Sequence, residues 1–356
     1  MNYYVTESFD DPKYKYLGGT KARDDIESVF KDLNMKELRM GITNRSSNTF
    51  ISSLARHIRV KKKWDSLFSV LNKNDSVFLQ YIILEHSIFF YRSVKALVKR
   101  GVNVVVIIHD LESLQNMTKT NASFLKRNRI AMEEKGIRHA SKIIVHNNRM
   151  RDVLVSRGFS AEKIIVLGIF DYLLPANSEE RLNEKKLSID QPIIVSGNLS
   201  KIKSAYIYDL PSDIEFNLYG TNYSGTTSKS IHYMGTFEAD DIPFVMTGSF
   251  GLVWDGESTE TCSGKFGEYL RINNPHKTSL YLVSGIPVII WREAALAEFV
   301  LDNNCGVVID KLSDIKRIKK NISKDEYEKM ENNAKRIGHM LSAGHYAKVA
   351  IKEALN

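Results

Sequence analysis

The sequence predicts an α/β protein with two domains, each built on a mainly parallel sheet covered by helices. Three observations support this fold class. The chain has 356 residues, and one domain usually takes about 100–200. Short, continuously apolar segments alternate with amphipathic ones, which is typical of strands buried on both faces of a doubly wound sheet. The alternation stops over the polar stretch 169–192 and then starts again, which indicates a linker between two such units.

The first unit opens with a helix at residues 20–33. Its apolar side chains recur at helical spacing on one face, namely Ala22, Ile26, Val29, Phe30 and Leu33. Apolar segments typical of buried strands follow at residues 77–81, 102–110, 142–147 and 163–168. Amphipathic segments that predict helices lie between or after them at residues 87–101, 123–140 and 149–158.

The second unit repeats the alternation. Strands are predicted at residues 193–198, 214–220, 231–235, 250–256, 287–291 and 306–310, and helices at 275–284 and 293–302. From Ser323 onward the pattern is helical throughout. We therefore expect a first domain at 1–170, a linker at 171–192 and a second domain at 193–340. A final helix at 341–356 is expected to pack back on the first domain.

The composition limits the partners and the compartment. Lys and Arg number 50 against 42 Asp and Glu, a net charge of +8, which favours acidic partners but is also common in ordinary globular proteins. The two cysteines form neither a disulfide framework nor a metal-ligand spacing. No apolar run reaches the ~18 residues of a membrane span, and the stretch MNYYVTESFDDPK lacks the features of a secretory signal. We expect a cytoplasmic protein whose basic patches allow peripheral contact with the inner face of a membrane.

Several familiar catalytic motifs are absent. The sequence has no HExxH, GxSxG or P-loop pattern. It also lacks the GxGxxG fingerprint, which argues against a nicotinamide enzyme. No DxD follows a predicted strand, so a metal-dependent sugar transferase is not indicated.

Polar residues gather after the strands of the second unit, where open α/β sheets bind their ligands. Gly197 and Asn198 end one strand and precede Lys201, a combination that allows a ligand close to the backbone and offers it a cation. His232 and Tyr233 lie in another strand, and Asp255 lies at the end of a third. The alternatives are a plain turn with solvated lysines, an aromatic that packs a strand, and an aspartate that caps a turn.

The stretch NNPHKTSLYLVSGIPVII, residues 273–290, predicts a helix followed by a strand. Asn274 fits the N-cap, Pro275 the first helical position, and Gly285 the stop. Lys277 lies in the first turn, where the helix dipole disfavours a cation by roughly 0.3–1 kcal/mol. A diphosphate bound at this helix start would make the position of Lys277 favourable, because the anion attracts both the lysine and the free amides of the first turn. The alternative is an exposed lysine, which costs little there.

Two places in the first unit are also candidates. His109 and Asp110 close the strand 102–110, and a carboxylate at that edge is placed to take a proton from an acceptor hydroxyl. The alternative is an aspartate that caps the next turn and a histidine bonded to backbone. Gly18, Gly19 and Thr20 lie where the first predicted helix begins. They form either a flexible acceptor-binding loop or simply the start of that helix.

The chain resembles bacterial glycosyltransferases of the GT-B fold: the β-1,6-galactofuranosyltransferases and the glucosyltransferase that extends GlcNAc on streptococcal serine-rich repeat adhesins. The resemblance runs nearly end to end through ordered pieces, GGTKARDDIESVF, VVVIIHDLESL, KIIVHNNRMRDVLVSRG, IIVLGIFDY, IIVSGNLSK, GLVWDG and NNPHKTSLYLVSGIPVIIW. It implies two facing doubly wound, Rossmann-like domains with a cleft between them. It also implies an N-terminal acceptor domain, a C-terminal UDP-sugar domain, no metal or other cofactor, and a homodimer or homotetramer.

The resemblance also assigns residues. Lys201 in GNLSK and the pair His276–Lys277 match diphosphate and ribose contacts, Tyr233 with His232 matches an aromatic near the uracil, and Thr20 with its glycines matches a mobile acceptor loop. Where the adhesin enzyme has an arginine in the GN loop, this chain has Lys201, which lacks the bidentate guanidinium. Where that enzyme has an aromatic before the helix lysine, this chain has His276.

The sequence thus predicts a metal-independent hexosyltransferase that moves galactofuranose from a UDP-sugar to a lipid- or protein-linked saccharide of the cell surface. Asp110 is the predicted base if the enzyme inverts. One alternative is a glucosyltransferase that acts on GlcNAc. Another is a non-catalytic partner subunit of a glycosyltransferase complex. A nucleic-acid binder is disfavoured, because the basic run Lys61–Lys63 is isolated.

Overall fold

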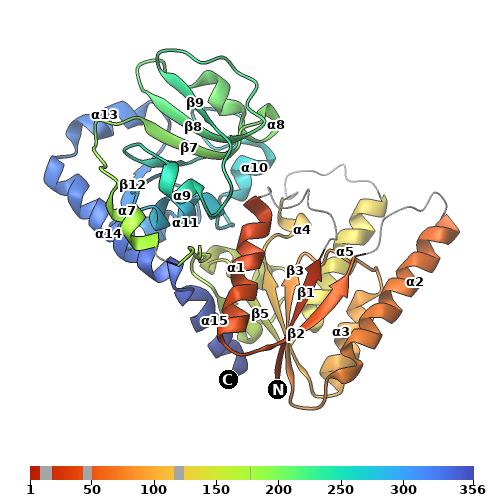
Figure 1. The fold of residues 1–356 in the computed structure, drawn as a ribbon. Coiled ribbons are helices and arrows are strands. Elements are labelled where there is room, and N and C mark those ends of the chain that lie inside the picture. Colours follow the sequence, from red (N-terminus) through yellow and green to blue (C-terminus); the bar gives the residue numbers. More distant parts are fainter. Residues whose placement is uncertain (9–17, 43–49, 116–123, 177) are drawn as a thin grey trace. The chain divides into compact units, whose positions relative to one another are not determined.

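The computed structural model describes residues 1–8, 18–42, 50–115, 124–176 and 178–356. The chain divides into two compact units (Figure 1). The first comprises Met1–Leu167 together with Ala347–Asn356, and the second is Gly168–Tyr346. The opening segment of the first unit therefore ends three residues before the predicted boundary at 170, and the second unit takes in the whole predicted linker, which contributes helix α7 (Ser178–Asn183).

The first unit contains a six-stranded sheet in the order β2-β1-β3-β4-β5-β6. Its strands are β1 (Asn2–Ser8), β2 (Lys36–Gly41), β3 (Ser76–Tyr81), β4 (Asn103–Ile108), β5 (Lys142–Val145) and β6 (Ile164–Val166). Neighbouring strands pair in parallel throughout. The strand order reverses between β1 and β3, which is the kind of switch point where such sheets open toward ligands.

Helices cover both faces of this sheet, with α1 and α15 on one side and α2 and α3 on the other (Figure 1). The helical elements are α1 (Gly18–Asp32), α2 (Phe50–Leu67), η2 (Phe68–Val70), α3 (Phe90–Lys99), α4 (Glu112–Gln115), α5 (Phe124–His139), α6 (Asn148–Ser156), η3 (Ala161–Lys163) and most of α15 (His345–Leu355). Phe30 of α1 lies between Tyr4 and Phe78 of the sheet, with ring centroids 4.9 and 5.2 Å away. The chain's last helix belongs to this core, since Asn103 Nδ2 donates to Ala354 O at 3.0 Å.

The second unit contains a six-stranded sheet in the order β12-β11-β10-β7-β8-β9, again parallel throughout. Its strands are β7 (Ile193–Asn198), β8 (Phe216–Thr221), β9 (Ile231–Gly235), β10 (Gly251–Val253), β11 (Val288–Trp291) and β12 (Gly306–Ile309). Its further helical elements are α8 (Lys201–Ser204), η4 (Ala205–Asp209), α9 (Ile242–Val245), α10 (Gly264–Tyr269), α11 (His276–Val283), α12 (Ala297–Asp302), α13 (Asp314–Asn321) and α14 (Lys324–Ser342).

Helix α11 is fixed to the sheet by Tyr281. A Cβ on Gly251 would lie 2.1 Å from the Tyr281 ring, so only glycine allows β10 this close approach. The Tyr281 hydroxyl lies 2.8 Å from Ser196 N in β7. At the other end, Gly285 has φ +75°, and Ile286 N donates to Tyr281 O at 2.9 Å. This is the Schellman arrangement that ends helices at glycine, so the predicted stop is confirmed.

Every strand predicted from a continuously apolar segment is present, and each observed end lies within three residues of the predicted one. The sequence-based assignment overlooked β1, β2 and α2. The expected cap of α11 was wrong by one position, because Pro275 occupies the N-cap and the Asn274 side chain donates to Gly168 O at 2.9 Å instead. No helix among the residues that the structure describes combines the length and apolarity needed to cross a bilayer.

Candidate functional site

The ends of β7 and β8 form an open backbone surface in the second unit. Gly197 and Gly220 lie opposite each other in the parallel register. A Cβ on Gly220 would lie 1.8 Å from Gly197 O, whereas a Cβ on Gly197 would meet nothing within 4 Å. Gly197 and Asn198 are exposed. The backbone at Gly197 is therefore accessible to a ligand, as the sequence predicts for this position.

The loop after β7 is held in shape by Asn198. Its Oδ1 accepts from Ser200 N at 3.1 Å and from Asn222 Nδ2 at 3.3 Å. Its carbonyl accepts from Ser204 Oγ at 3.0 Å. Lys201 begins α8 beside this loop and is exposed. Asn198 thus orders the loop that presents Lys201.

Three tyrosines stack beside the same loop. The Tyr208 and Tyr223 ring centroids are 5.7 Å apart, and those of Tyr223 and Tyr233 are 5.3 Å apart. Lys201 Nζ lies 5.0 Å from the Tyr208 ring centroid. Tyr233 ends the series, is 40% exposed, and donates its hydroxyl to Gly220 O at 2.9 Å. The stack offers an aromatic face next to a cation and an open backbone.

His232 does not join this cluster. Neighbouring residues of a strand point to opposite faces, and His232 Nε2 lies 3.6 Å from Glu215 Oε2, just before the start of β8. Tyr233 instead contacts Gly220 near the end of β8. Tyr233 thus lies near the carboxyl end of the strand pair, and His232 lies toward its amino end.

Lys277 is paired with Asp255 inside the unit. Its Nζ lies 2.9 Å from Asp255 Oδ1 and 3.1 Å from Trp254 O, and the two side chains are 11% and 7% exposed. The carboxylate supplies the anion that a lysine in a first helical turn requires. The position of Lys277 is thus explained by Asp255 without a ligand. Gly256 N donates to Lys203 O at 3.1 Å, which joins the Asp255 loop to the loop after β7.

His276 packs at the start of α11. Its ring stacks on Tyr172 with centroids 4.9 Å apart, and its Nε2 lies 3.1 Å from Asp171 O. Together with Asn274, it fastens the start of the helix to residues 168–172. These contacts anchor the first turn of α11, which also carries Lys277.

His109 and Asp110 directly follow β4 in the first unit, and both are partly exposed. His109 Nε2 lies 2.7 Å from Gln80 Oε1, and Gln80 Nε2 donates to Glu27 Oε1 at 3.2 Å. An amide oxygen only accepts, so a hydrogen bond here requires the Nε2-protonated form of His109. Burial raises the pKa of Glu27 to about 7, and Asp24 adds to the shift. Asp110 Oδ1 accepts from Gln115 Nε2 at 3.0 Å.

The acceptor loop expected at Gly18, Gly19 and Thr20 is instead the first turn of α1. Helical hydrogen bonding extends back to Gly18, two residues before the predicted start. Residues 9–17, which precede them, lie outside the described residues. Among the residues that the structure describes, no group of three His, Cys, Asp or Glu side chains is arranged to hold a metal ion.

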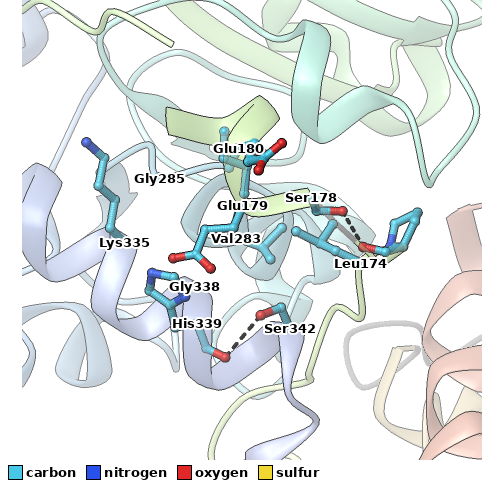
Figure 2. Close-up of a pocket in the computed structure, with 13 residues that line it drawn as sticks. Leu174, Ser178, Glu179, Glu180, Val283, Gly285, Lys335, Gly338, His339 and Ser342 are labelled. Carbon is cyan, nitrogen blue, oxygen red and sulfur yellow. Dashed lines mark hydrogen bonds between the residues drawn. The ribbon is translucent and has the colours of Figure 1, made fainter. Parts of the chain in front are cut away.

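A separate hollow of about 400 Å³ lies in the second unit, at the carboxyl end of α11 (Figure 2). The lining comes from α11's end at Val283, Ser284 and Gly285, from one face of α14, and from the segment before and within α7, namely Leu174, Pro175, Ser178, Glu179, Glu180 and Leu182. Figure 2 shows Ser178 bonded to the Pro175 carbonyl and Ser342 to the His339 carbonyl. None of the sequence-predicted site residues lines this hollow.

Family comparisons cover most of the chain. The model of the glucosyltransferase 3-like N-terminal domain matches residues 2–169, and that of the glucosyltransferase 3-like C-terminal domain matches residues 193–354. The β-1,6-galactofuranosyltransferase WbbI of Escherichia coli (strain K12) is 34% identical over 274 residues, which is 75% of this chain and 74% of the relative. Glucosyltransferase 3 of Streptococcus gordonii is 23% identical over 337 residues, 94% of this chain and 93% of the relative.

Solved structures agree with the fold. Sucrose-phosphate synthase from Thermosynechococcus elongatus superposes with a TM-score of 0.62 at 11% identity, over 99% of this chain and 97% of the other. Anabaena HepE, solved in complex with UDP, gives 0.62 at 12% identity over 100% and 99%. WaaG, a glycosyltransferase involved in lipopolysaccharide biosynthesis, gives 0.55 at 12% over 99% and 98%. The two parallel sheets with their helices form a GT-B fold, as the sequence predicts.

Proposed function

The chain belongs to the glucosyltransferase 3-like family, and from this we propose that it is a glycosyltransferase that moves a hexosyl unit from a UDP-sugar to an acceptor sugar. The observation that carries the proposal is the cluster at the ends of β7, β8 and β9. It joins an open glycine backbone, a cation and an exposed aromatic face within one unit. A nucleoside diphosphate needs these three elements.

In the proposed complex the uracil stacks on Tyr233, since aromatic stacking is worth about 1–3 kcal/mol per base. The diphosphate lies over Gly197, and the ammonium group of Lys201 neutralises part of its negative charge. Lys277 adds a second cation. An ammonium group has three N–H donors, and Asp255 and Trp254 O account for two. The third is left to reach a phosphate oxygen while the ion pair stays intact.

Departure of UDP creates negative charge, which lysines and backbone amides stabilise without a metal. We expect activity to persist in the presence of a chelator. If the enzyme inverts, Asp110 is the proposed base for the acceptor hydroxyl. The hydrogen bond from Gln115 to one of its oxygens orients this carboxylate.

Galactofuranose is the proposed sugar, because the galactofuranosyltransferase WbbI is 34% identical to this chain. Glucose is the second candidate. It is favoured by the match to the Streptococcus gordonii enzyme, which spans 94% of this chain. In either case we propose a lipid- or protein-linked saccharide of a cell-surface glycoconjugate as acceptor, a cytoplasmic location and a homo-oligomer.

A thermal-shift and turnover screen over UDP-sugars, including UDP-galactofuranose and UDP-glucose, tests the proposal. We expect UDP to raise the melting midpoint. Lys201→Ala should weaken UDP binding about tenfold or more, because it removes a charge-assisted contact worth about 1.5–3 kcal/mol. Lys229→Ala, an exposed lysine in the same unit, is the matched control. If no UDP-linked ligand shifts the melting midpoint, the protein does not have the proposed function.

A further inference from the structure

The positive charge of this chain is concentrated on one layer of helices in the first unit. Helices α2 and α3 cover the same side of the first sheet (Figure 1), and Ser93 of α3 donates to Asp65 of α2 at 2.7 Å. The ring of Tyr91 in α3 lies 6.3 Å from that of His139 in α5. These three helices, here called the basic layer, contain 13 Lys and Arg against 3 Asp and Glu, a net +10. The whole chain carries +8, so all other residues together carry −2.

Many cations of the basic layer lack a neighbouring carboxylate. Helix α3 contains no acidic residue. Two lysines of α2 are neutralised, since Lys61 pairs with Asp65 and Lys63 with Glu85. Six further cations are exposed and form no ion pair within the described part of the chain, namely Arg59, Lys62, Arg92, Lys95, Lys99 and Lys135. Like charges gathered in this way repel one another, so an anionic partner would stabilise the layer.

Tyr91 and His139 respond to this charge. Arg92 Nε donates to the Tyr91 hydroxyl at 3.2 Å, and Lys135 Nζ lies 5.6 Å from the Tyr91 ring centroid. The bond from Arg92 lowers the pKa of Tyr91, and the charges of Lys135 and Lys95 lower it further. Burial lowers the pKa of His139, and nearby lysines, Lys95 foremost, add to that shift. The potential between α3 and α5 is therefore positive.

Aliphatic side chains are exposed beside these cations. Leu54 and Ile58 lie one turn apart on α2 and are 38% and 44% exposed. Arg59 and Lys62 of the same helix are exposed as well. A helix that presents Lys and Arg together with aliphatic residues is stabilised at the boundary between lipid headgroups and acyl chains. Single-stranded nucleic acids are instead held by stacking on aromatic side chains, which Leu54 and Ile58 cannot provide.

We propose that the basic layer is a docking surface for a membrane that contains anionic phospholipids. Lipid phosphates accept hydrogen bonds from its ammonium and guanidinium groups, and Leu54 and Ile58 enter the headgroup region. The association is peripheral, because no helix of the described residues can cross a bilayer. This surface belongs to the first unit and the proposed nucleotide site to the second, so the proposal stands independently of the proposed function.

Flotation of the full chain with lipid vesicles tests the proposal. We expect binding to vesicles of phosphatidylcholine mixed with phosphatidylglycerol, little binding to phosphatidylcholine alone, and release at high salt, which screens exposed charges. Lys95→Gln/Lys135→Gln should weaken binding at least about tenfold, because each basic side chain near an anionic surface contributes about fivefold. The matched control, Lys229→Gln/Lys320→Gln, removes two exposed lysines of the second unit and should bind like the wild type.

Leu54→Gln/Ile58→Gln separates a membrane from other anionic partners. It keeps every charge and should still weaken vesicle binding, because it removes the exposed aliphatic surface. If this variant keeps full affinity for vesicles, or if the wild type binds double-stranded DNA more tightly than anionic vesicles, the surface recognises polyanions in general and the proposal is wrong.

Two other results also overturn the proposal: a wild-type chain that does not float with anionic vesicles, and a Lys95→Gln/Lys135→Gln variant that floats as well as the wild type. All of these substitutions replace exposed side chains, so the melting midpoint and UDP binding of each variant should match those of the wild type. UDP binding without vesicle binding removes only this docking surface. Vesicle binding without UDP binding removes only the proposed function.

Discussion

At the residue scale, Lys277 shows how a buried ion pair constrains its partners. Removing one member of such a pair leaves an uncompensated buried charge and typically costs about 3–5 kcal/mol. We therefore expect Asp255→Ala to lower the free energy of unfolding by that amount, measured by urea denaturation. The double variant Asp255→Ala/Lys277→Met should recover most of the lost stability, because it no longer buries an unpaired ammonium group.

The exposed pair Arg292–Asp310, with side chains 55% and 66% exposed, is the matched control. Asp310→Ala should leave the free energy of unfolding close to the wild-type value, because an exposed ion pair is screened by solvent and contributes little. Equal losses for Asp255→Ala and Asp310→Ala would mean that the Asp255–Lys277 pair is solvated, contrary to its burial.

Glu27 gives the first unit a pH dependence. Its pKa in the folded chain is raised from 4.5 to about 7, chiefly by burial. The folded state therefore holds a proton that the unfolded state has lost, and this contribution to stability is complete below about pH 4.5 and lost as pH rises through 7. Glu27→Gln should gain stability relative to the wild type between pH 5 and pH 8, as followed by urea unfolding at unit steps. A stability difference that stays constant over this range would contradict the raised pKa.

At the scale of elements, the sequence identified strands where burial on both faces imposes a continuous apolar run, as in β4, where Val104–Ile108 are buried. This criterion missed β2, because β2 is an edge strand with one buried residue, Met40, and so has no continuous apolar run. The buried stripe of α2 is narrow, Val60 and Trp64 followed by Phe68, and it lies among lysines and arginines. A search at spacing i, i+4 and i+8 would have found it.

The candidate site was predictable only in part. Gly197 and Asn198 end β7 and Lys201 follows it, so topology alone indicates them. The Tyr208–Tyr223–Tyr233 stack and the Asp255–Lys277 pair depend on side chains from separate elements. No local pattern in the sequence encodes such long-range pairing.

Gly251 is the element-scale test of how α11 is positioned. A Cβ there would lie 2.1 Å from the Tyr281 ring, which is fully buried. Gly251→Ala forces the ring or the strand to shift, and overpacking of this kind typically costs about 1–3 kcal/mol. Because α11 carries Lys277, UDP affinity should fall as well. Both effects are measurable by thermal denaturation and calorimetric titration.

Gly41 is the matched control, because a Cβ on it would meet nothing within 4 Å. We expect Gly41→Ala to leave both the melting midpoint and UDP affinity near the wild-type values. A Gly251→Ala variant that behaves in the same way would show that α11 does not depend on this close approach.

At the scale of the whole molecule, the last helix completes the first unit although it follows the second in sequence. Lys348 Nζ pairs with Asp32 Oδ2 at 3.1 Å, and Ile351 is fully buried. Ile351→Ala should lower the free energy of unfolding of the first unit by about 2–5 kcal/mol, as large-to-small core changes do. Val349→Ala, at a site 52% exposed on the same helix, should have little effect. Equal effects in urea denaturation would show that α15 does not pack here.

The second unit, by contrast, is one continuous segment whose two ends meet. Tyr346 N donates to Asp171 Oδ1 at 3.2 Å, and a Cβ on Gly168 would lie 3.5 Å from the Tyr346 ring. Its core extends from Ile169 to Leu341 without residues of the first unit, and Gly197, Lys201, Tyr233 and Lys277 all lie within it. The fragment 168–346 should therefore fold alone, with a cooperative melting transition, and bind UDP within a few-fold of the full chain. A folded fragment that does not bind UDP, beside a full chain that does, would place essential nucleotide contacts in the first unit.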